Sequence, residues 1–209
     1  MPEQPLDPQQ LDPQQLESLR QAIASGDPAR AMPALASLRE VSPEQAIPLL
    51  LLGLEQEIFM IRSLSCAGLG YKQSEQGWEA LVGALLHDDD PNVRAEAANA
   101  LVNHSLERAW PLLLEAFQRD EQWLLRCSVL SAVAEHPAMA AGDLLQLARL
   151  ALVDGDGTVR IGGTEILGRL VREAAVDSEA AAQARALLAQ LQLDPDHRVV
   201  AAALNGLQG

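Results

Sequence analysis

Residues 90–101 read DPNVRAEAANAL, and residues 156–167 repeat the pattern as DGTVRIGGTEIL. The arginine of this motif recurs at a regular spacing: Arg30, Arg62, Arg94 and Arg126 are 32 residues apart, and Arg160 follows after 34. A period of this size is typical of stacked helical units, each of which buries its apolar face against its neighbours. The chain is therefore predicted to be a repeat protein.

The composition predicts that the repeats are helical. Hydrophobic residues make up 48% of the chain but aromatic residues only 3%, so most of the apolar content is Ala and Leu. These two residues are strong helix formers, whereas strands favour β-branched and aromatic residues. Together with the period, this predicts an all-α fold, an α-solenoid (superhelix) of about six helix hairpins.

Capping side chains followed by proline mark the predicted helix starts. Such pairs occur at Asp12-Pro13, Asp27-Pro28, Ser42-Pro43 and Asp90-Pro91. Proline loses no needed hydrogen bond at the first helical position. The apolar spacing then predicts first helices over 13–25, 43–54, 74–87, 105–119, 138–153 and 178–192. It predicts second helices over 28–40, 58–71, 91–103, 121–135, 157–172 and 196–207.

The domain organisation follows from the same pattern. Residues 1–11 are rich in Pro and Gln with little to bury, so we expect a flexible N-terminal tail. Residues 12–209 are predicted to form a single solenoid domain. Its end units should carry polar outer faces, because a stack buries its core only between neighbouring units.

Charge and cysteine content narrow the classes of function. The formal net charge is −14 and Lys72 is the only lysine, so the chain should repel phosphate backbones and anionic lipid surfaces. No apolar run is long enough to span a bilayer. Two cysteines cannot form a disulfide framework. We therefore expect an acidic cytoplasmic protein that binds neither nucleic acid nor membranes.

The motif Asp-x-x-Val-Arg-x-x-Ala-x-x-Ala-Leu, read from residues 90–101, resembles a HEAT repeat. Within that superfamily the chain is most similar, over residues 43–172, to the HEAT-like repeats of the phycobilin (phycobilisome) lyase family of cyanobacteria. The resemblance implies an α-solenoid. It also implies one of several roles: attaching bilins to phycobiliproteins, dismantling phycobilisomes, or binding a partner such as an iron–sulphur scaffold protein.

The motif arginines are predicted to hold the units in register. Arg94 should lie at the edge of the buried stripe that Val93 and Leu101 define, because successive helical residues turn by about 100°. From there an arginine reaches an aspartate at the next turn, such as Asp90 or Asp156. A ligand-binding row of arginines is the alternative.

Histidines and cysteines are the other reactive residues. His104 and His136 occupy equivalent positions in successive units, where each should serve a turn, and the sequence places no third or fourth ligand beside them for a metal. Cys66 is predicted to be a core residue, whereas Cys127 should lie opposite the core. No catalytic residue and no cofactor is assigned.

The strongest candidate for a functional surface is the side of each second helix opposite the core. In α-solenoids of this kind the second helices line the concave side, where partners bind. Small polar residues there offer hydrogen bonds at low desolvation cost. The predicted partner-binding residues are Asn92, Glu96, Asn99, Asn103, Ser128, Ser131, Glu135, Glu165 and Arg169.

Two hypotheses for function follow. The first is a non-catalytic adaptor or scaffold that holds a protein partner in this groove, either as a monomer or in a heteromeric complex. Its partner belongs, by resemblance, to phycobiliprotein or iron–sulphur maturation. The alternative is a bilin lyase subunit that attaches a tetrapyrrole chromophore to a cysteine of a phycobiliprotein, with the bilin as its cofactor.

Overall fold

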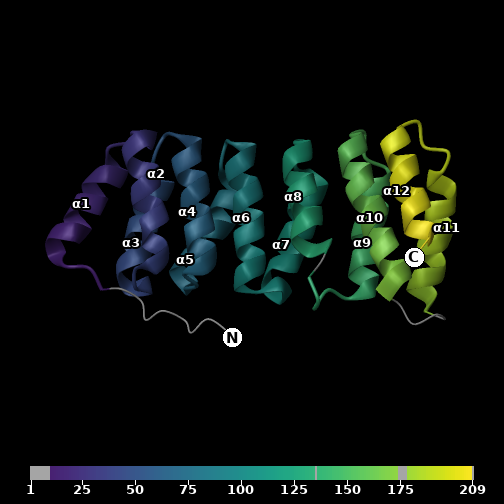
Figure 1. Cartoon of the computed structure of the whole chain (residues 1–209), viewed down its shortest axis with the longest axis horizontal. Helices are drawn as coiled ribbons and strands as arrows, with labels where there is room; N and C mark the ends of the chain where they lie inside the picture. Colours follow the sequence, from purple (N-terminus) through teal and green to yellow (C-terminus); the bar gives the residue numbers. More distant parts are fainter. Residues whose placement is uncertain (1–9, 135, 174–177, 209) are drawn as a thin grey trace. The chain divides into compact units, whose positions relative to one another are not determined.

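A computed structural model describes residues 10–134, 136–173 and 178–208 of the chain. Among these residues it contains twelve α-helices, one short 3-10 helix and no β-strand (Figure 1). The chain divides into two compact units, one ending at Ala109 and the other beginning at Trp110. The all-α prediction is confirmed.

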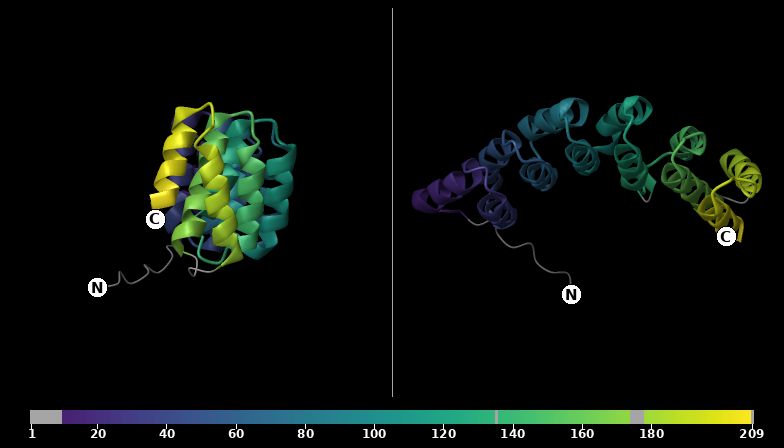
Figure 2. Two further views of the ribbon diagram at one scale, coloured as in Figure 1. Left: turned by 90° about the vertical axis from the view of Figure 1, so that its right-hand side faces the viewer. Right: turned by 90° about the horizontal axis from the view of Figure 1, so that it is seen from above.

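The first unit consists of successive helix hairpins. Its elements are α1 (Pro13–Ala24), α2 (Pro28–Ser37), the 3-10 helix η1 (Leu38–Glu40), α3 (Pro43–Leu54), α4 (Phe59–Tyr71), α5 (Glu75–His87) and α6 (Pro91–His104). The second helices α2, α4 and α6 pack side by side in one layer, and the first helices α1, α3 and α5 form the other (Figures 1 and 2).

The second unit continues the same alternation. Its elements are α7 (Leu106–Arg119), inside which the boundary between the units falls, α8 (Trp123–Ala134), α9 (Ala141–Leu152), α10 (Gly157–Glu173), α11 (Glu179–Leu191) and α12 (His197–Gln208). Here α10 packs between α8 and α12, and α9 contacts α11. The six predicted hairpins are thus present, and most predicted helix bounds lie within three residues of the observed ones.

Aspartates start several helices in the predicted way. Asp12 accepts hydrogen bonds from the backbone N–H groups of Gln14 and Gln15, both at 2.9 Å. Asp90 accepts one from Asn92 at 2.8 Å, and Asp156 accepts one from Thr158 at 2.7 Å. A side-chain oxygen that satisfies an otherwise unpaired N–H of the first turn fixes where the helix begins.

The core runs between the two helix layers of each unit. In the first unit Ile61, Leu81, Val93 and Leu101 are all completely buried, and Trp78 is 7% exposed. Each large aliphatic side chain buried in this way contributes about 1.5–3 kcal/mol relative to an exposed one. Because these residues come from successive hairpins, the core is shared between neighbours.

The predicted N-terminal tail lies mostly outside the described residues, which begin at Gln10. Leu11 is attached to the solenoid: its backbone N–H donates to Oε1 of Gln45 at 2.8 Å, and Nε2 of Gln45 donates to its carbonyl oxygen at 3.0 Å. Gln45 belongs to α3, so the solenoid is contacted from residue 11 onward.

Candidate protein-binding face

The motif arginines join successive hairpins, as predicted, but through a different aspartate. In the first unit Arg62 of α4 binds both carboxylate oxygens of Asp88, with Nε at 2.7 Å and Nη2 at 2.8 Å. Its Nη1 also donates to the carbonyl oxygens of Gln56 and Glu57, in the loop before its own helix. One guanidinium thus holds its own hairpin loop and the next one together.

The second unit repeats this arrangement twice. Arg126 of α8 binds Asp154 at 2.6 and 3.1 Å, and Arg160 of α10 binds Asp194 at 2.9 and 3.0 Å. These arginine side chains are 15% and 14% exposed, and both carboxylates are 9% exposed. A bidentate pair that is largely withdrawn from water fixes geometry strongly.

The predicted partners Asp90 and Asp156 are therefore wrong for this role. Each caps its own helix, and the aspartate two positions earlier takes the arginine. That earlier aspartate also accepts a backbone N–H: Asp88 from Asp90 at 2.9 Å, and Asp154 from Asp156 at 2.8 Å. The turn so formed points the first carboxylate back toward the preceding hairpin.

The charges of these pairs shift the pKa values of the aspartates. The hydrogen bond from Arg160 holds the pKa of Asp194 below its ordinary value. Burial raises the pKa of Asp88, but the hydrogen bonds from Arg62 and the Asp90 N–H outweigh it, so the net shift is downward. Both carboxylates are thus stabilised in their ionised form.

We use the name second-helix stripe for the positions of each second helix that lie opposite its buried side. In α6 these are Asn92, Glu96, Asn99 and Asn103, of which Asn92 and Asn103 are exposed and the other two are half-buried. Partial burial raises the pKa of Glu96. Nδ2 of Asn92 donates to Asp90 at 2.9 Å. The stripe of α6 is polar, as predicted.

In the second unit the stripe runs over α8 and α10. Ser128 is half-buried and Ser131 is exposed, whereas Glu135 lies outside the described residues. Glu165 of α10 is exposed and lines a groove between α10 and α12. Ser131 and Glu165 therefore lie on accessible surface.

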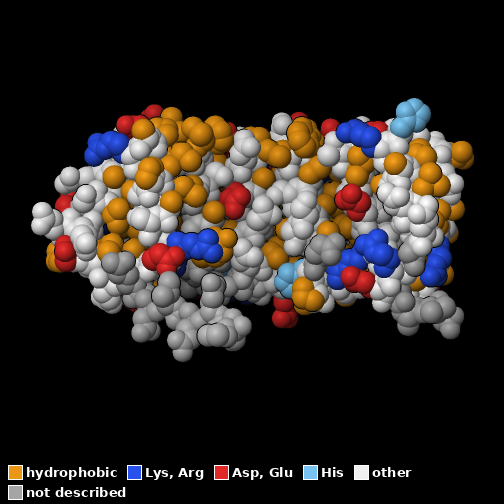
Figure 3. All heavy atoms as spheres, in the orientation of Figure 1, with side chains coloured by type: hydrophobic (Ala, Val, Ile, Leu, Met, Phe, Trp, Pro, Cys, Tyr) orange, Lys and Arg blue, Asp and Glu red, His pale blue; other side chains and the backbone are white. Residues whose placement is uncertain are grey.

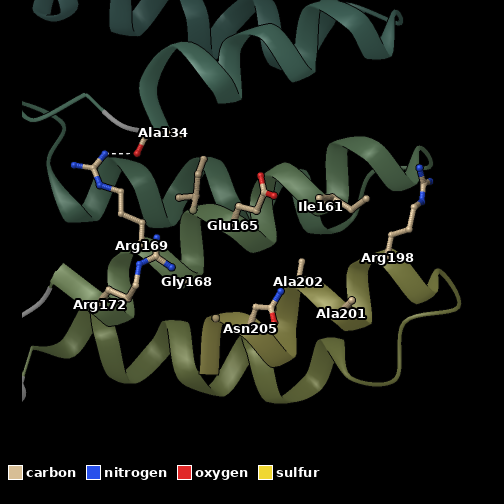
Figure 4. A pocket seen from close by; sticks show the side chains of 12 residues that line it. Ala134, Ile161, Glu165, Gly168, Arg169, Arg172, Arg198, Ala201, Ala202 and Asn205 are labelled. Carbon is tan, nitrogen blue, oxygen red and sulfur yellow. Dashed lines mark hydrogen bonds between the residues drawn. The ribbon is translucent and has the colours of Figure 1, made fainter. Parts of the chain in front are cut away.

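This groove, which we call the α10/α12 groove, has a volume of about 590 Å³ (Figure 4). Its lining includes Ile161, Glu165, Gly168, Arg169 and Arg172 of α10, and Arg198, Ala201, Ala202, Asn205 and Gly206 of α12. A methyl group built on Gly168 would lie 3.2 Å from Cα of Gly206, so the helices approach closely at this point. The lining combines small and aliphatic residues with charged and amide side chains.

Arg169 is used differently from its prediction as a partner-binding residue. It is only 6% exposed. Its guanidinium donates to the backbone carbonyl oxygens of Val133, Ala134 and His136, at the end of α8, and to Glu173 at 2.7 Å. Since carbonyl groups at a helix end lack partners within the helix, Arg169 ties α8 to α10. The exposed cations in the groove lining are Arg172 and Arg198.

The two histidines serve helix ends and turns. Nε2 of His104 lies 2.9 Å from the carbonyl oxygen of Leu69, and its ring lies 6.0 Å from that of Trp78. Nδ1 of His136 accepts the Ala138 N–H at 3.2 Å. The contact of His136 agrees with its predicted turn role, whereas His104 contacts the end of α4 in the preceding hairpin. Within the described part of the chain, no group of three His, Cys, Asp or Glu side chains could hold a metal ion.

The two cysteines are free thiols with weak acidity. Cys66 is buried in α4 as predicted, and burial, followed by the charges of Glu96 and Asp88, raises its pKa to about 12. Cys127 is half-buried rather than fully exposed, and burial is also the main reason why its pKa is raised. The structure thus places neither thiol in an activating environment.

Comparison with known proteins identifies the repeats. A sequence model of HEAT repeats matches residues 47–134, a range that contains α4, α5, α6, α7 and α8. Residues 47–134 therefore consist of HEAT-like repeats. No curated protein matches the sequence significantly.

Several solved structures share the architecture. YibA of Escherichia coli has a TM-score of 0.67 at 16% identity, with 94% of this chain and 70% of that chain covered. An archaeal HEAT-like repeats protein from Thermococcus onnurineus NA1 has a TM-score of 0.56 at 14% identity, covering 99% and 81%. Cex1p has a TM-score of 0.66 at 17% identity, and this chain spans only 43% of it. These likenesses show the α-solenoid fold.

The finer part of the sequence resemblance is not confirmed by these comparisons. Neither the family match nor the solved structures named above concern phycobilin lyases. Membership of that family therefore stays a prediction.

Among the described helices, none has the length and apolar character needed to cross a lipid bilayer.

Proposed function

We propose that this HEAT-like repeat protein is a non-catalytic scaffold that holds a protein partner on its second-helix stripe. The observation that carries the proposal is the α10/α12 groove, where stripe positions of two neighbouring helices surround an open channel of about 590 Å³. HEAT repeats commonly form such interaction scaffolds, because a row of parallel helices presents an extended binding surface.

The chemistry of the groove suits an extended peptide segment. Ala201, Ala202 and Gly206 are small lining residues, which leaves room for a second backbone beside them. The Asn205 amide can both donate to and accept from that backbone, which has the same groups. Glu165, Arg172 and Arg198, all exposed, add charges of both signs to the lining. Such a mixture gives directional contacts at a low desolvation cost.

The nature of the partner rests on the family resemblance alone. We propose phycobiliprotein maturation and iron–sulphur maturation as the processes in which to search for it. The raised pKa values of Cys66 and Cys127 favour a binding role over thiol chemistry, because a thiol that stays protonated at neutral pH is a poor nucleophile.

A capture experiment tests the scaffold role. The full-length chain is immobilised, crosslinked in lysate of its own organism, and compared with the double variant Glu165→Arg and Ala201→Phe, which fills and recharges the groove. The partner band should disappear for this variant. Ala182→Phe on α11 changes an exposed alanine away from the groove and is the matched control.

Equal capture by the groove variant and wild type would contradict the proposal, provided both have the same helical circular dichroism.

Bilin lyase activity is tested by a separate experiment. The chain is co-expressed with a phycobiliprotein subunit and a bilin-producing pathway, and the scaffold role predicts no covalently attached visible chromophore. A coloured adduct that forms only when the chain is present would show lyase activity and contradict the non-catalytic scaffold role.

A further inference from the structure

The second-helix stripe is polar in α6 but apolar in α4, one repeat earlier in the chain. Subtracting 32 from the α6 stripe positions gives Met60, Leu64, Ala67 and Tyr71 of α4. These four residues lie opposite the buried side of α4, which contains Ile61, Ser65 and Leu69. Met60 is 41% exposed and Tyr71 63% exposed. The α4 stripe is thus apolar where the α6 stripe is polar.

A pocket lies beside this apolar stripe. It has a volume of about 240 Å³ and is lined by Leu35, Ala36, Leu38 and Arg39 of α2 and η1, Leu50 of α3, and Leu64, Ala67, Gly68, Tyr71 and Lys72 in and after α4. We call it the α2/α4 pocket. Figure 3 shows that hydrophobic side chains gather on the surface over α2 and α4. The pocket has room for about one large side chain.

The charged residues of the pocket are all basic. The guanidinium of Arg39 stacks over the Tyr71 ring at 5.1 Å from its centre, which holds a cation at the rim. Nζ of Lys72 donates to the carbonyl oxygens of Arg39 and Val41, at 2.7 and 2.6 Å. The lining contains no carboxylate, although the chain has 29 acidic and only 15 basic residues. Its charge therefore complements an anion.

From this geometry we infer that the α2/α4 pocket and the α4 stripe bind an amphipathic helix of a protein partner. One large apolar side chain of that helix enters the pocket, and a carboxylate beside it pairs with Arg39. The α4 stripe from Met60 to Tyr71 is about 16 Å long at 1.5 Å per residue, so it matches about three turns of a partner helix rather than one small molecule. This inference does not depend on the α10/α12 groove.

Two designed helical peptides test the inference. Both have 15 residues and the same Leu face, and the flanking positions carry Glu in one peptide and Lys in the other. Binding of each fluorescein-labelled peptide to the full-length chain is measured by anisotropy. We expect the Glu peptide to bind about 10-fold more tightly, because it pairs with Arg39 whereas the Lys peptide is repelled.

Variants separate the pocket from the rest of the surface. Arg39→Gln should reduce the preference for the Glu peptide to about 2-fold or less. Ala67→Phe, which fills the pocket, should weaken the Glu peptide by about 10-fold or more, and Ala36→Phe does the same from the α2 side. Ala201→Phe and Arg172→Gln make matched changes in the α10/α12 groove and should leave both affinities unchanged.

Several results would overturn the inference. The first is that neither peptide binds even at about 1 mM protein, a concentration at which weak complexes are still detected. The second is that the two peptides bind with equal affinity. The third is that correctly folded Ala67→Phe and Ala36→Phe variants bind the Glu peptide as tightly as the wild type does. Self-association abolished by Ala67→Phe would assign the pocket to a second copy of the chain. Octanoate bound in an Arg39-dependent way while both peptides fail would assign it to a small carboxylate.

Discussion

The guanidinium of Arg160 and the carboxylate of Asp194 form a bidentate pair that joins the hairpin of α10 to the loop before α12, with N–O distances of 2.9 and 3.0 Å. Nη1 of the same arginine donates to the carbonyl oxygens of Asp154 and Gly155, in the loop before α10. A single side chain therefore joins the interhelical loops of two successive hairpins. Arg62 and Arg126 repeat this connection at their own hairpins.

Removing one of these arginines should destabilise its unit. Arg126→Ala leaves the nearly buried Asp154 without its counter-ion, so we expect a loss of about 2 kcal/mol in the free energy of unfolding. For a chain of this size that corresponds to a fall of about 4–8 °C in Tm, measured by circular dichroism.

Arg30 provides the matched control for that loss. It occupies the same motif position in α2 but is exposed, and no ion pair to it is present among the described residues. Arg30→Ala should change the free energy of unfolding by less than about 0.5 kcal/mol. Equal effects of Arg30→Ala and Arg126→Ala would show that the motif arginines do not hold the hairpins together.

The pKa of Asp194 should make the second unit sensitive to acid. Since Arg160 lowers the pKa of Asp194 in the folded state, the pair contributes stability that is fully present above the unfolded-state pKa of about 3.9. That stability is lost as the pH falls through the lower folded-state value. NMR titration of the Asp194 carboxyl should show this depressed pKa, and Arg160→Gln should return it toward 3.9. A pKa that is unchanged in the variant would exclude Arg160 as its cause.

The two thiols should react slowly with a disulfide reagent at pH 7.5. Cys66, with a pKa of about 12, is expected to react only after unfolding in denaturant, because both burial and protonation protect it. Cys127 should react in the native state, but more slowly than a free cysteine peptide. Rapid native labelling of either residue would mean that its thiol is activated.

Ser42 should be dispensable as a helix cap. Its hydroxyl is buried and makes no hydrogen bond within the described structure, and it does not cap α3. Ser42→Ala is therefore expected to be neutral or slightly stabilising. Asp90→Ala removes a cap that does accept an N–H and should cost about 1 kcal/mol. Urea unfolding curves of the two variants measure the difference, and a larger loss for Ser42→Ala would contradict this account.

Local signals made the helices predictable from the sequence. Capping aspartates and prolines at the first helical position act within a few residues of the helix that they start. The 32-residue period showed that these local signals recur along the chain. The burial of Cys66 followed from the helical spacing.

The features that the sequence did not predict depend on how loops and neighbouring helices are oriented. Arg62 forms its ion pair with Asp88 rather than Asp90, because the Asp90 N–H donates to the Asp88 carboxylate and orients that side chain toward the arginine. Arg169 turns back onto the end of α8, which its position on the stripe could not show. The apolar α4 stripe could have been predicted from the sequence, because its residues lie 32 positions before those of the α6 stripe. The α2/α4 pocket could not, because its lining also includes residues of η1.

Site-specific photocrosslinking tests the scaffold role most directly. A benzophenone amino acid is placed at Ala201, in the α10/α12 groove, or at Ala182, on α11, and the full-length chain is irradiated in lysate of its own organism. The account predicts a discrete protein adduct from position 201 and none from position 182. The same adduct from position 182 alone, or from neither position, would contradict binding on the second-helix stripe.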